Sequence, residues 1–354
     1  MVVRSQPSNL RADVIVWQLI VWWLAGLLIS PPVSAAVVKR SQMHMGTLVW
    51  VTAVAPDNTT AQRAAALALE EIKRLDQLLS TWIPTSEISR INAAAGRSPV
   101  HVSPETMEVL SSSLEIARLT DGAFNICVGP AVRAWDINAG GRIPSKDELE
   151  HLRPLVDLSQ VILDHQLQTV FLAHPGMEVD IGGIGKGFAA DRAVLAMQEA
   201  GATAGVVALS GDIKTFGRLP GGERFVFGIQ HPRREPGRLL ARLELENEAV
   251  STAGDYQRYF IQHGIRYHHI LDPATLRPAR LTQSVTIIAS EGTVADGLDT
   301  GIFVLGPTKG MALIEQLPEV EGVIVGHDGA VYVSTGLQNR LQLEPDIAPA
   351  YLAP

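Results

Sequence analysis

The sequence predicts an α+β fold with mixed or antiparallel sheets and flanking helices. An alternating strand pattern over 47–55 is followed by an amphipathic helical pattern over 61–80, and the C-terminal half is rich in short strands. Because strands and helices do not alternate strictly, this class is favoured over a doubly wound parallel sheet. With 354 residues, 46% of them hydrophobic, the chain can bury a large core, as one big domain or two smaller ones.

The first 36 residues form a separate N-terminal segment. Arg4 and Arg11 precede an apolar run at 14–29, and small residues follow it, a pattern typical of a secretory signal peptide. The run is shorter than the roughly 20 residues that a spanning helix needs, but its tryptophans leave an uncleaved anchor open. The sequence therefore divides into 1–36, a signal peptide or N-terminal anchor, and one domain over 37–354. We expect the protein to be extracytoplasmic, in the periplasm if the cell is Gram-negative, and anchored in the inner membrane if the segment is not cleaved.

Helix signals mark three segments of the N-terminal half. In 61–80, apolar residues recur on one face at helical spacing. A second helix is expected to begin after Ser103, where a serine N-cap precedes a proline, and to end at the Thr-Asp-Gly of 120–122. A third, shorter helix should follow Ser145, which is spaced from Glu148 as in a capping box.

The rest of the chain is predicted to consist mainly of strands. The stretch 161–173 is typical of a hairpin that turns near His165 and Gln166. A glycine-rich segment then leads into a helix that ends at Gly201, and one more helix is expected over 311–317. Strands are predicted at VVALS, FVFGIQ, RLLARLELE, RYFIQ, SVTIIA, GVIVG and AVYVS.

The net charge bears on the partner that the protein can bind, and the cysteine content bears on whether it can form a disulfide. The formal net charge is -8 and no run of lysines and arginines interrupts it, which gives no reason to expect a nucleic-acid partner. The single cysteine, Cys127, makes an intramolecular disulfide impossible. A buried structural role for Cys127 is favoured over a nucleophilic one, because no histidine with matching geometry is evident.

The loop GGIGKG at 182–187 lacks both common nucleotide-binding motifs. Its Gly-Lys pair is followed by Gly187, where a P-loop has Ser or Thr, and Asp180 stands at the upstream glycine position. Consecutive glycines nevertheless let the backbone approach a ligand, and a helix N-terminus beside Lys186 favours an anion. A glycine turn that only permits tight packing explains the loop equally well.

Three oxygen-bearing side chains lie close together in ADGLDTG, at Asp296, Asp299 and Thr300. If a helix begins here, they share one face, because positions three and four apart are neighbours. Their hard oxygen atoms suit Mg²⁺ or Ca²⁺ rather than zinc. The alternative is that one aspartate caps the helix while the other favours its positive end. Two aspartates on one face repel each other, which slightly favours the metal site.

Two adjacent histidines, His268 and His269, stand at the end of an apparent strand, before a turn at Asp272. Neighbouring residues of a strand point to opposite faces, so at most one of them faces a given site. An ordinary core or surface histidine is the usual explanation of such residues. No second cluster of zinc ligands lies nearby in the sequence, which argues against a zinc site.

Short blocks that include these stretches occur in one order along the chain. They are MGT (45–47), LLSTWIPTSEISRIN (78–92), TDGAFNICVGP (120–130), VDIGGIGKGFAAD (179–191), ALSGDIKTFG (208–217), STAGDYQRYF (251–260), HHILDP (268–273) and ADGLDTG (295–301). In this order they resemble the ApbE family of FAD:protein FMN transferases over nearly all of 37–354. The resemblance implies a T-fold-related architecture with the FAD site in a cleft between two subdomains.

The resemblance also implies a set of functional residues. FAD contacts are implied for Met45, Trp82, Ala123, Phe124, Asn125, Asp180, Lys186 and Leu271. Mg²⁺ ligands are implied for the backbone carbonyl of Gly183 and for Asp296, Asp299 and Thr300, and a general-base role for His269. Trp82 stands where the family usually has Tyr, and either ring can stack on a flavin or adenine. Asn125, Cys127 and Leu276 depart from the usual Asp, Thr and Gly.

The activity implied by the resemblance is Mg²⁺-dependent transfer of FMN from FAD to a Thr or Ser hydroxyl of an acceptor protein. AMP would leave, and the acceptor would be a subunit of a membrane redox complex. Two alternatives remain open at this point. An FAD pyrophosphatase would use water in place of the acceptor and release FMN and AMP, and an extracytoplasmic FAD-binding or assembly protein would release neither. Product analysis with and without an acceptor separates the three.

Overall fold

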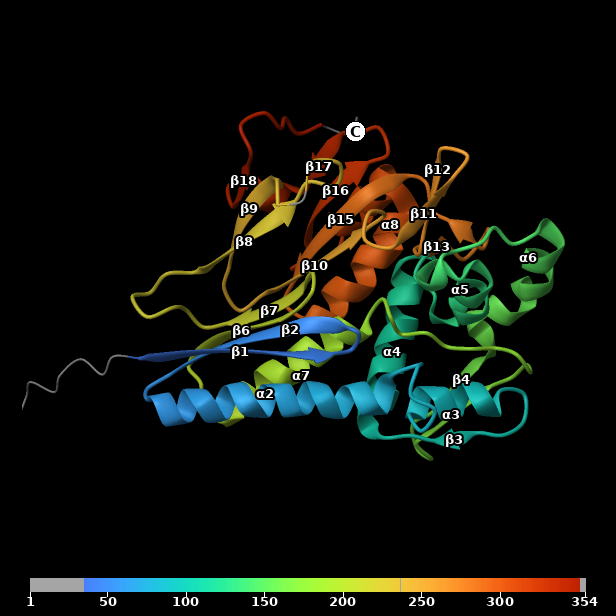
Figure 1. The fold of residues 1–354 in the computed structure, drawn as a ribbon, viewed down its shortest axis with the longest axis horizontal. Coiled ribbons are helices and arrows are strands. Elements are labelled where there is room, and N and C mark those ends of the chain that lie inside the picture. The colour runs from blue at the N-terminus through green and yellow to red at the C-terminus, as the bar shows by residue number, and fades with distance from the viewer. Residues whose placement is uncertain (1–34, 236, 351–354) are drawn as a thin grey trace, which may run out of the picture.

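The computed structural model describes residues 35–235 and 237–350. Its centre is an eight-stranded sheet in the order β1-β2-β6-β7-β10-β15-β16-β17, in which every neighbouring pair runs antiparallel (Figure 1). The α+β class with antiparallel sheets is confirmed. The bounds are β1 (Ala36–His44), β2 (Thr47–Ala55), β6 (Ala204–Leu209), β7 (Asp212–Phe216), β10 (Ala249–Gly254), β15 (Thr282–Ala289), β16 (Glu321–Gly326) and β17 (Val331–Val333).

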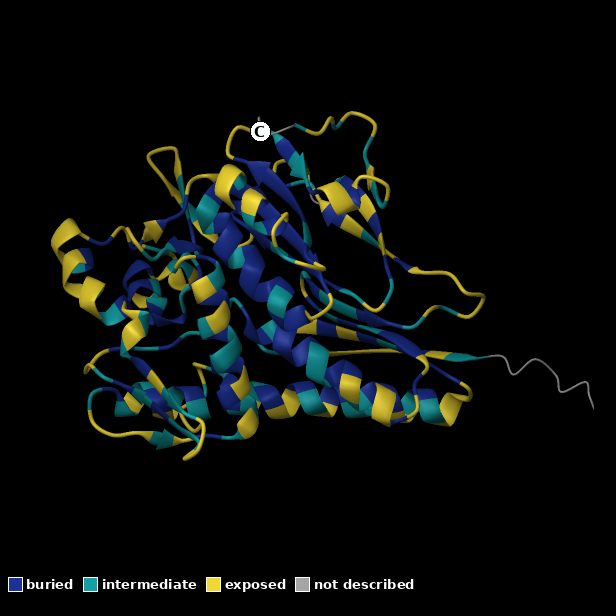
Figure 2. Ribbon diagram, turned by 180° about the vertical axis from the view of Figure 1, so that it is seen from behind, coloured by how far each residue is buried: buried dark blue, intermediate teal, exposed yellow. Residues whose placement is uncertain are grey.

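Three helices cover one face of this sheet. They are α2 (Asn58–Leu79), α7 (Gly185–Glu199) and α8 (Gly292–Ile314). Their buried sides share one hydrophobic cluster with alternate residues of the strands, and Figure 2 shows these buried sides turned inward. The alternating pattern of β2 explains which of its faces packs on the helices. Val49, Val51 and Ala53 point to the helices, while Leu48 and Trp50 are exposed on the other face.

A second, three-stranded sheet packs on the opposite face. It has the order β18-β9-β8, formed by β8 (Phe225–Gln230), β9 (Leu239–Leu245) and β18 (Leu341–Leu343). Leu240 and Leu243 of β9 share a cluster with Val250 of β10 and Ile288 of β15. The strands of the main sheet around β15 are therefore covered on both faces, which explains why β15 is buried along its whole length.

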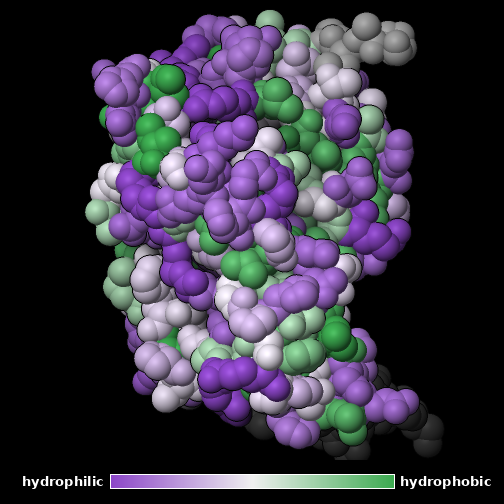
Figure 3. Space-filling model, turned by 90° about the vertical axis from the view of Figure 1, so that its right-hand side faces the viewer, coloured by the Kyte–Doolittle hydropathy of each residue, from purple (hydrophilic) through white to green (hydrophobic). Residues whose placement is uncertain are grey.

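The polypeptide between α2 and α7 forms the other end of the molecule. Its elements are α3 (Glu87–Ala94), β3 (Val100–His101), α4 (Pro104–Leu119), α5 (Gly129–Trp135), α6 (Lys146–Leu152), β4 (Val161–Asp164) and β5 (Thr169–Leu172). Figure 3 views this end, where hydrophobic residues form separate groups between hydrophilic ones. The predicted signals hold here: Ser103 Oγ accepts from the Thr106 amide at 3.3 Å, and α4 is followed by left-handed Asp121 and Gly122.

Two of the expected elements form differently from the prediction. The helix expected over 311–317 is the continuation of α8 beyond a kink at Gly306 (φ 82°, ψ 175°), which precedes Pro307. At Ser145 only half of the capping box forms, because the Glu148 amide binds Ser145 Oγ while the Glu148 carboxylate pairs with Arg142.

The N-terminal segment predicted over 1–36 falls outside the described residues except for its end. Ala36 already belongs to β1, where it pairs with Ala55. Within the described part of the chain, no helix combines the length and the apolar character needed to cross a bilayer. The nature of residues 1–34 thus stays a prediction from sequence.

Candidate active site

The N-terminal turns of α7 and α8 meet in close backbone contact. A methyl group on Gly187 would lie 2.0 Å from the carbonyl oxygen of Gly292, so only glycine allows this approach. Asp191 of α7 accepts from the amides of Gly292 (2.7 Å) and Thr293 (2.8 Å) and thereby caps α8 from outside. The alternative that Asp296 or Asp299 caps α8 is wrong, because α8 begins at Gly292 and both aspartates lie inside the helix. Asp296 Oδ2 instead accepts from the Gly187 amide of α7 at 2.8 Å.

Three carboxylates converge beside this contact. Asp212, at the start of β7, joins Asp296 and Asp299 of α8, and ligand atoms of the three lie within 4.8 Å of one another. All three residues are buried. Lys186 Nζ forms an ion pair with Asp212 and lies 3.6 Å from Asp296 Oδ1. Ser251 of β10 hydrogen-bonds to Asp212 and lies 2.6 Å from Asp299 Oδ2.

Burial and mutual repulsion raise the pKa values of the carboxyls on α8. Desolvation, followed by the charge of Asp212, raises the pKa of Asp296 to about 7. Desolvation, followed by the charge of Asp296, raises the pKa of Asp299 well above its ordinary value. Burial opposes the charge on Lys186, but the carboxylates of Asp212 and Asp296 more than compensate and raise its pKa. Without a further cation, the site therefore retains protons near neutral pH.

The predicted metal ligands lie together and suit a divalent cation. A Cβ on Gly183 would lie 3.1 Å from Thr300 Oγ1, and that hydroxyl donates to Asp299 Oδ1 at 3.1 Å. When ionised, the three carboxylates and Lys186 sum to −3 + 1 = −2, the charge that one divalent cation balances. The donors are hard oxygens, which favour Mg²⁺ or Ca²⁺.

The retained protons give the metal-free protein a pH-dependent stability. Asp299 keeps its proton in the folded state at pH values where it is ionised in the unfolded chain, so the free energy of unfolding falls as pH rises above about 4. We expect Asp299→Asn to remove this loss and to raise the melting temperature in EDTA more at pH 8 than at pH 5. Equal shifts at both pH values would contradict the expectation.

Several of the implied FAD contacts line the same region. The Asp180 amide donates to the Ile126 carbonyl at 2.7 Å, which ties the glycine loop to the segment that contains Ala123, Phe124 and Asn125. A Cβ on Gly183 would lie 3.3 Å from Phe124 Cε2, and one on Gly301 of α8 would lie 3.1 Å from Phe124 Cβ. Phe124 therefore packs between the loop and α8.

Met45 approaches the glycine loop from the β1–β2 turn. Its Cε would lie 3.8 Å from a Cβ on Gly185. Met45 has a left-handed backbone (φ 49°), and its amide donates to Asp76 Oδ2 of α2 at 2.9 Å, which holds this unusual conformation. Asp76 was not singled out from the sequence.

Trp82 and Leu271 are placed differently from the other implied contacts. Trp82 follows α2 and its side chain is 82% exposed, so the ring is free to stack on a planar ligand. Leu271, in β13 (Leu271–Asp272), is buried in a separate cluster with Trp135 and Leu276. The structure does not bring either side chain against the carboxylate cluster, and their roles stay predictions.

His268 and His269 have different surroundings, as expected for neighbouring residues at the end of a strand. His268 ends β12 (Ile265–His268), is buried, and its Nε2 lies 2.7 Å from the Ala279 carbonyl oxygen. His269 is half-buried, and its Nδ1 lies 3.3 Å from the Arg258 carbonyl oxygen. Desolvation, then the charges of Arg258 and His268, lower the pKa of His269 to about 3, and Lys186 also contributes.

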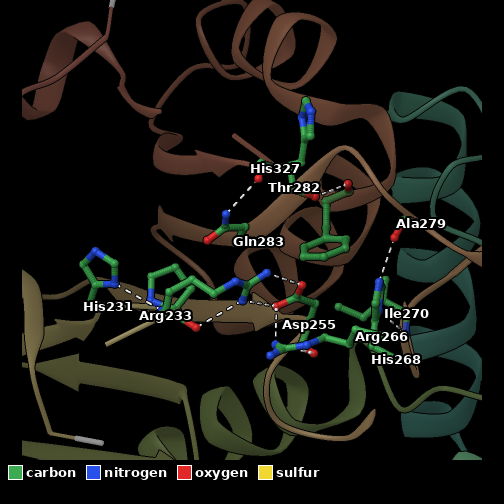
Figure 4. A network of polar contacts seen from close by, with 12 residues as sticks. His231, Arg233, Asp255, Arg266, His268, Ile270, Ala279, Thr282, Gln283 and His327 are labelled. Atoms are coloured by element: carbon green, nitrogen blue, oxygen red, sulfur yellow. Dashed lines mark hydrogen bonds and ion pairs between the residues drawn. The ribbon is translucent and has the colours of Figure 1, made fainter. Parts of the chain in front are cut away.

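A charged network holds the segment that leads to these histidines. Arg233, in the loop after β8, forms a two-pronged ion pair with Asp255 after β10, with distances of 2.7 and 2.6 Å (Figure 4). Arg266 of β12 approaches the same carboxylate at 3.3 Å. Because Asp255 is buried, the network fixes β12 relative to the main sheet.

Two of the departures from the family pattern are structurally accommodated. Asn125 Oδ1 accepts from the Cys127 amide at 2.7 Å, and its Nδ2 donates to the Val156 carbonyl at 2.9 Å, a bond that Asp does not provide. Cys127 is fully buried, and this burial raises the pKa of its thiol to about 12. Its inertness fits the structural role predicted for it.

Leu276, the third departure, has the left-handed backbone (φ 56°) that favours glycine. Its side chain is fully buried, and its carbonyl accepts from Trp135 Nε1 at 2.7 Å. We expect Leu276→Gly to lower the free energy of unfolding by about 2 kcal/mol, because lost burial outweighs relieved strain. Leu276→Ala should cost about 1 kcal/mol more, since it loses the burial and keeps the strain. Urea denaturation checks the order, and an alanine variant at least as stable as the glycine variant would contradict it.

Asp212 and Ser251 are site residues that the sequence analysis did not identify. Both lie within blocks that resemble the family, yet neither β7 nor β10 was predicted as a strand. The available signal was the position of Asp212 at the start of a short strand-like run after two small residues. Nothing local pointed to Ser251, whose partners are 39 and 48 residues away.

Comparisons with known proteins agree on one family. A family model described as the ApbE family matches residues 45–324. The chain is 32% identical over 311 residues to an FAD:protein FMN transferase of Klebsiella pneumoniae (strain 342), covering 87% of this chain and 95% of that protein. It is also 32% identical over 327 residues to an FAD:protein FMN transferase of Treponema pallidum (strain Nichols), covering 86% and 89%.

Solved structures give the same result. The fold is similar to a crystal structure of the ApbE protein of Thermotoga maritima, with a TM-score of 0.79 and 31% identity over 86% of this chain and 98% of that one. A flavin transferase ApbE of Vibrio cholerae matches with a TM-score of 0.76 and 27% identity, over 86% and 99%.

Proposed function

Because this chain belongs to the ApbE family, we propose that it is an FAD:protein FMN transferase, which moves FMN from FAD to a Thr or Ser hydroxyl of an acceptor protein. The observation that carries the proposal is the place of Lys186. Its ammonium stands at the first turn of α7, directly after the glycine loop and among three buried carboxylates. Such a site combines a cationic side chain, which attracts the anionic pyrophosphate, with oxygen ligands for a metal cation.

The reaction is a displacement at phosphorus. The acceptor hydroxyl oxygen forms a bond to the FMN-side phosphorus of the FAD pyrophosphate, and the bond from that phosphorus to the bridging oxygen breaks. AMP leaves with the bridging oxygen, and the acceptor retains FMN as a phosphoester. Mg²⁺ held by the Gly183 carbonyl, Asp296, Asp299 and Thr300 would neutralise the pyrophosphate oxygens.

Lys186 and the glycine loop bind and orient the pyrophosphate. The Lys186 ammonium keeps its charge at neutral pH, because the carboxylates raise its pKa. It therefore stabilises negative charge that builds up on the departing AMP. The amides of Gly185 and Gly187 in the first turn of α7 are already bound, to the Ile181 carbonyl and to Asp296 Oδ2, both at 2.8 Å, so the positive charge offered to the anion is that of the Lys186 ammonium.

His269 takes the proton of the acceptor hydroxyl. With Nδ1–H donating to the Arg258 carbonyl, Nε2 is left as the proton acceptor. The lowered pKa keeps the ring neutral at physiological pH. The negative charge of bound FAD opposes the effect of Arg258 and Lys186 and makes Nε2 more basic when substrate is present.

Export and the acceptor's identity are further parts of the proposal. The N-terminal pattern supports an extracytoplasmic enzyme whose acceptor is a redox-complex subunit exposed on the same side of the membrane. Cell fractionation with N-terminal sequencing of the mature chain tests this. A cytoplasmic protein with an intact N-terminus would overturn it.

The test of the activity uses the purified protein with FAD and Mg²⁺, with and without an acceptor protein that carries a candidate Thr or Ser. AMP is followed by chromatography and acceptor mass by mass spectrometry. Equal amounts of AMP and of acceptor heavier by one FMN group are expected. FMN and AMP without acceptor labelling would indicate a pyrophosphatase, and intact bound FAD would indicate a binding protein.

A further inference from the structure

We propose that Lys186 is a built-in competitor for the metal ligand Asp296, and that Asp212 is the positioning residue that retains Lys186 when a divalent cation takes Asp296. The inference rests on the proposed function for the identity of the cation and the substrate. It adds roles for Asp212 and Ser251.

The contacts of Lys186 are unequal. Its ammonium forms a direct ion pair with Asp212, while Asp296 Oδ1 lies at 3.6 Å, at the outer limit of an ion pair. Asp296 is also held by the Gly187 amide through its other oxygen. The oxygen of Asp296 that faces Lys186 is therefore the one available to another cation.

Asp212 is the partner of Lys186 whose position is fixed by the fold. It is 4% exposed and lies at the start of β7, opposite Ser251 of the paired strand β10. The Ser251 hydroxyl touches both Asp212 and Asp299 and so fixes the distance between the anchor of the lysine and the predicted metal site. A sheet holds these two residues, whereas Lys186 has a flexible four-carbon side chain.

Charge explains the competition. Lys186 and a divalent cation both bind the carboxylates of this cluster, Asp296 among them. Two cations a few ångströms apart also repel each other. With Asp212 present, Lys186 can leave Asp296 and keep a full ion pair. Without the Asp212 charge, its remaining carboxylate partners in the cluster are the predicted metal ligands Asp296 and Asp299.

The experiment measures Mg²⁺ affinity by titration calorimetry of the FAD-free, full-length protein. Lys186→Met should tighten Mg²⁺ binding by roughly tenfold or more, because a repelling cation is removed. Asp212→Asn should weaken it by roughly tenfold, because Lys186 then moves toward Asp296. Lys73→Met, which removes an exposed lysine of α2, is the matched control and should leave the affinity unchanged.

The double variant separates positioning from direct ligation. If Asp212 acts through Lys186, Asp212→Asn should weaken Mg²⁺ binding at least about fivefold less in the Lys186→Met background than alone. An equal loss in both backgrounds would make Asp212 a direct ligand and overturn the inference. Unchanged or weaker binding by Lys186→Met would also overturn it.

Two readouts keep this result distinct from failure of the proposed function. If the wild-type protein transfers FMN but binds Mg²⁺ equally with and without the lysine, only the inference fails. If the wild-type protein binds no Mg²⁺, both the inference and the proposed role of the metal fail. Thermal unfolding confirms that each variant is folded, and Lys186→Gln replaces Lys186→Met if the latter is not.

Discussion

Asp296→Ala is expected to abolish FMN transfer, lowering kcat/KM by at least about a thousandfold. Asp296 is buried at the contact of α7 and α8, where it accepts from the Gly187 amide and faces Lys186. The substitution removes a predicted metal ligand and an anion that Lys186 faces. Transfer to the acceptor is measured by mass spectrometry, and Mg²⁺ binding by calorimetry of the same preparation.

The isosteric Asp296→Asn variant shows whether charge or shape causes the loss. Its amide oxygen can still accept from Gly187, so the contact between the helices is preserved. We expect it to be nearly as inactive as the alanine variant. Asp328→Asn, in the turn between β16 and β17, is the control and should transfer FMN normally. A fully active Asp296→Ala enzyme would remove Asp296 from the set of metal ligands, and a fully active Asp296→Asn enzyme would show that its negative charge is not required.

His269→Asn is expected to lower the rate of transfer by roughly 10²–10⁴-fold, which is the usual contribution of a general base. Asparagine can keep the contact with the Arg258 carbonyl but offers no basic nitrogen. FAD affinity should stay within about twofold of the wild type, since no anchoring charge is removed. Single-turnover kinetics with saturating FAD and a separate FAD titration measure the two quantities.

The matched control for His269 is His263→Asn. His263 lies in the exposed turn between β11 (Tyr259–Gln262) and β12, with a left-handed backbone (φ 51°) that asparagine tolerates well. Its transfer rate should equal that of the wild type. If His269→Asn retains full activity, another group removes the proton. If FAD binding falls together with the rate, His269 is a binding residue rather than a base.

Local patterns predicted those parts of the site that depend on local spacing. Asp296, Asp299 and Thr300 lie on one face of α8 because they are three and four positions apart, and the same rule holds although α8 begins at Gly292 rather than at Ala295. Ser103 likewise predicted the start of α4, because its bond with the Thr106 amide lies within the first turn of that helix.

The remaining parts of the site depend on contacts across the fold. Asp212 meets Lys186 from a strand 26 residues away, and Asp191 caps a helix that begins 101 residues later. Both β7 and β10 are short and pair in the middle of the main sheet, so tertiary packing rather than an alternating pattern defines them. No local signal in a single sequence reports such partners.

The contact between Gly187 and Gly292 affects how the enzyme binds its ligands. Since two backbones touch and Asp191 closes the gap, the backbone positions that carry the carboxylates of α8 and Lys186 of α7 are already fixed before anything binds. Little conformational entropy is then lost on association, so affinity is not spent on assembling the pocket. The same preorganisation makes the region sensitive to substitution, because a side chain at position 187 would push α7 and α8 apart. A displacement of catalytic groups by about 1 Å can lower the rate a hundredfold.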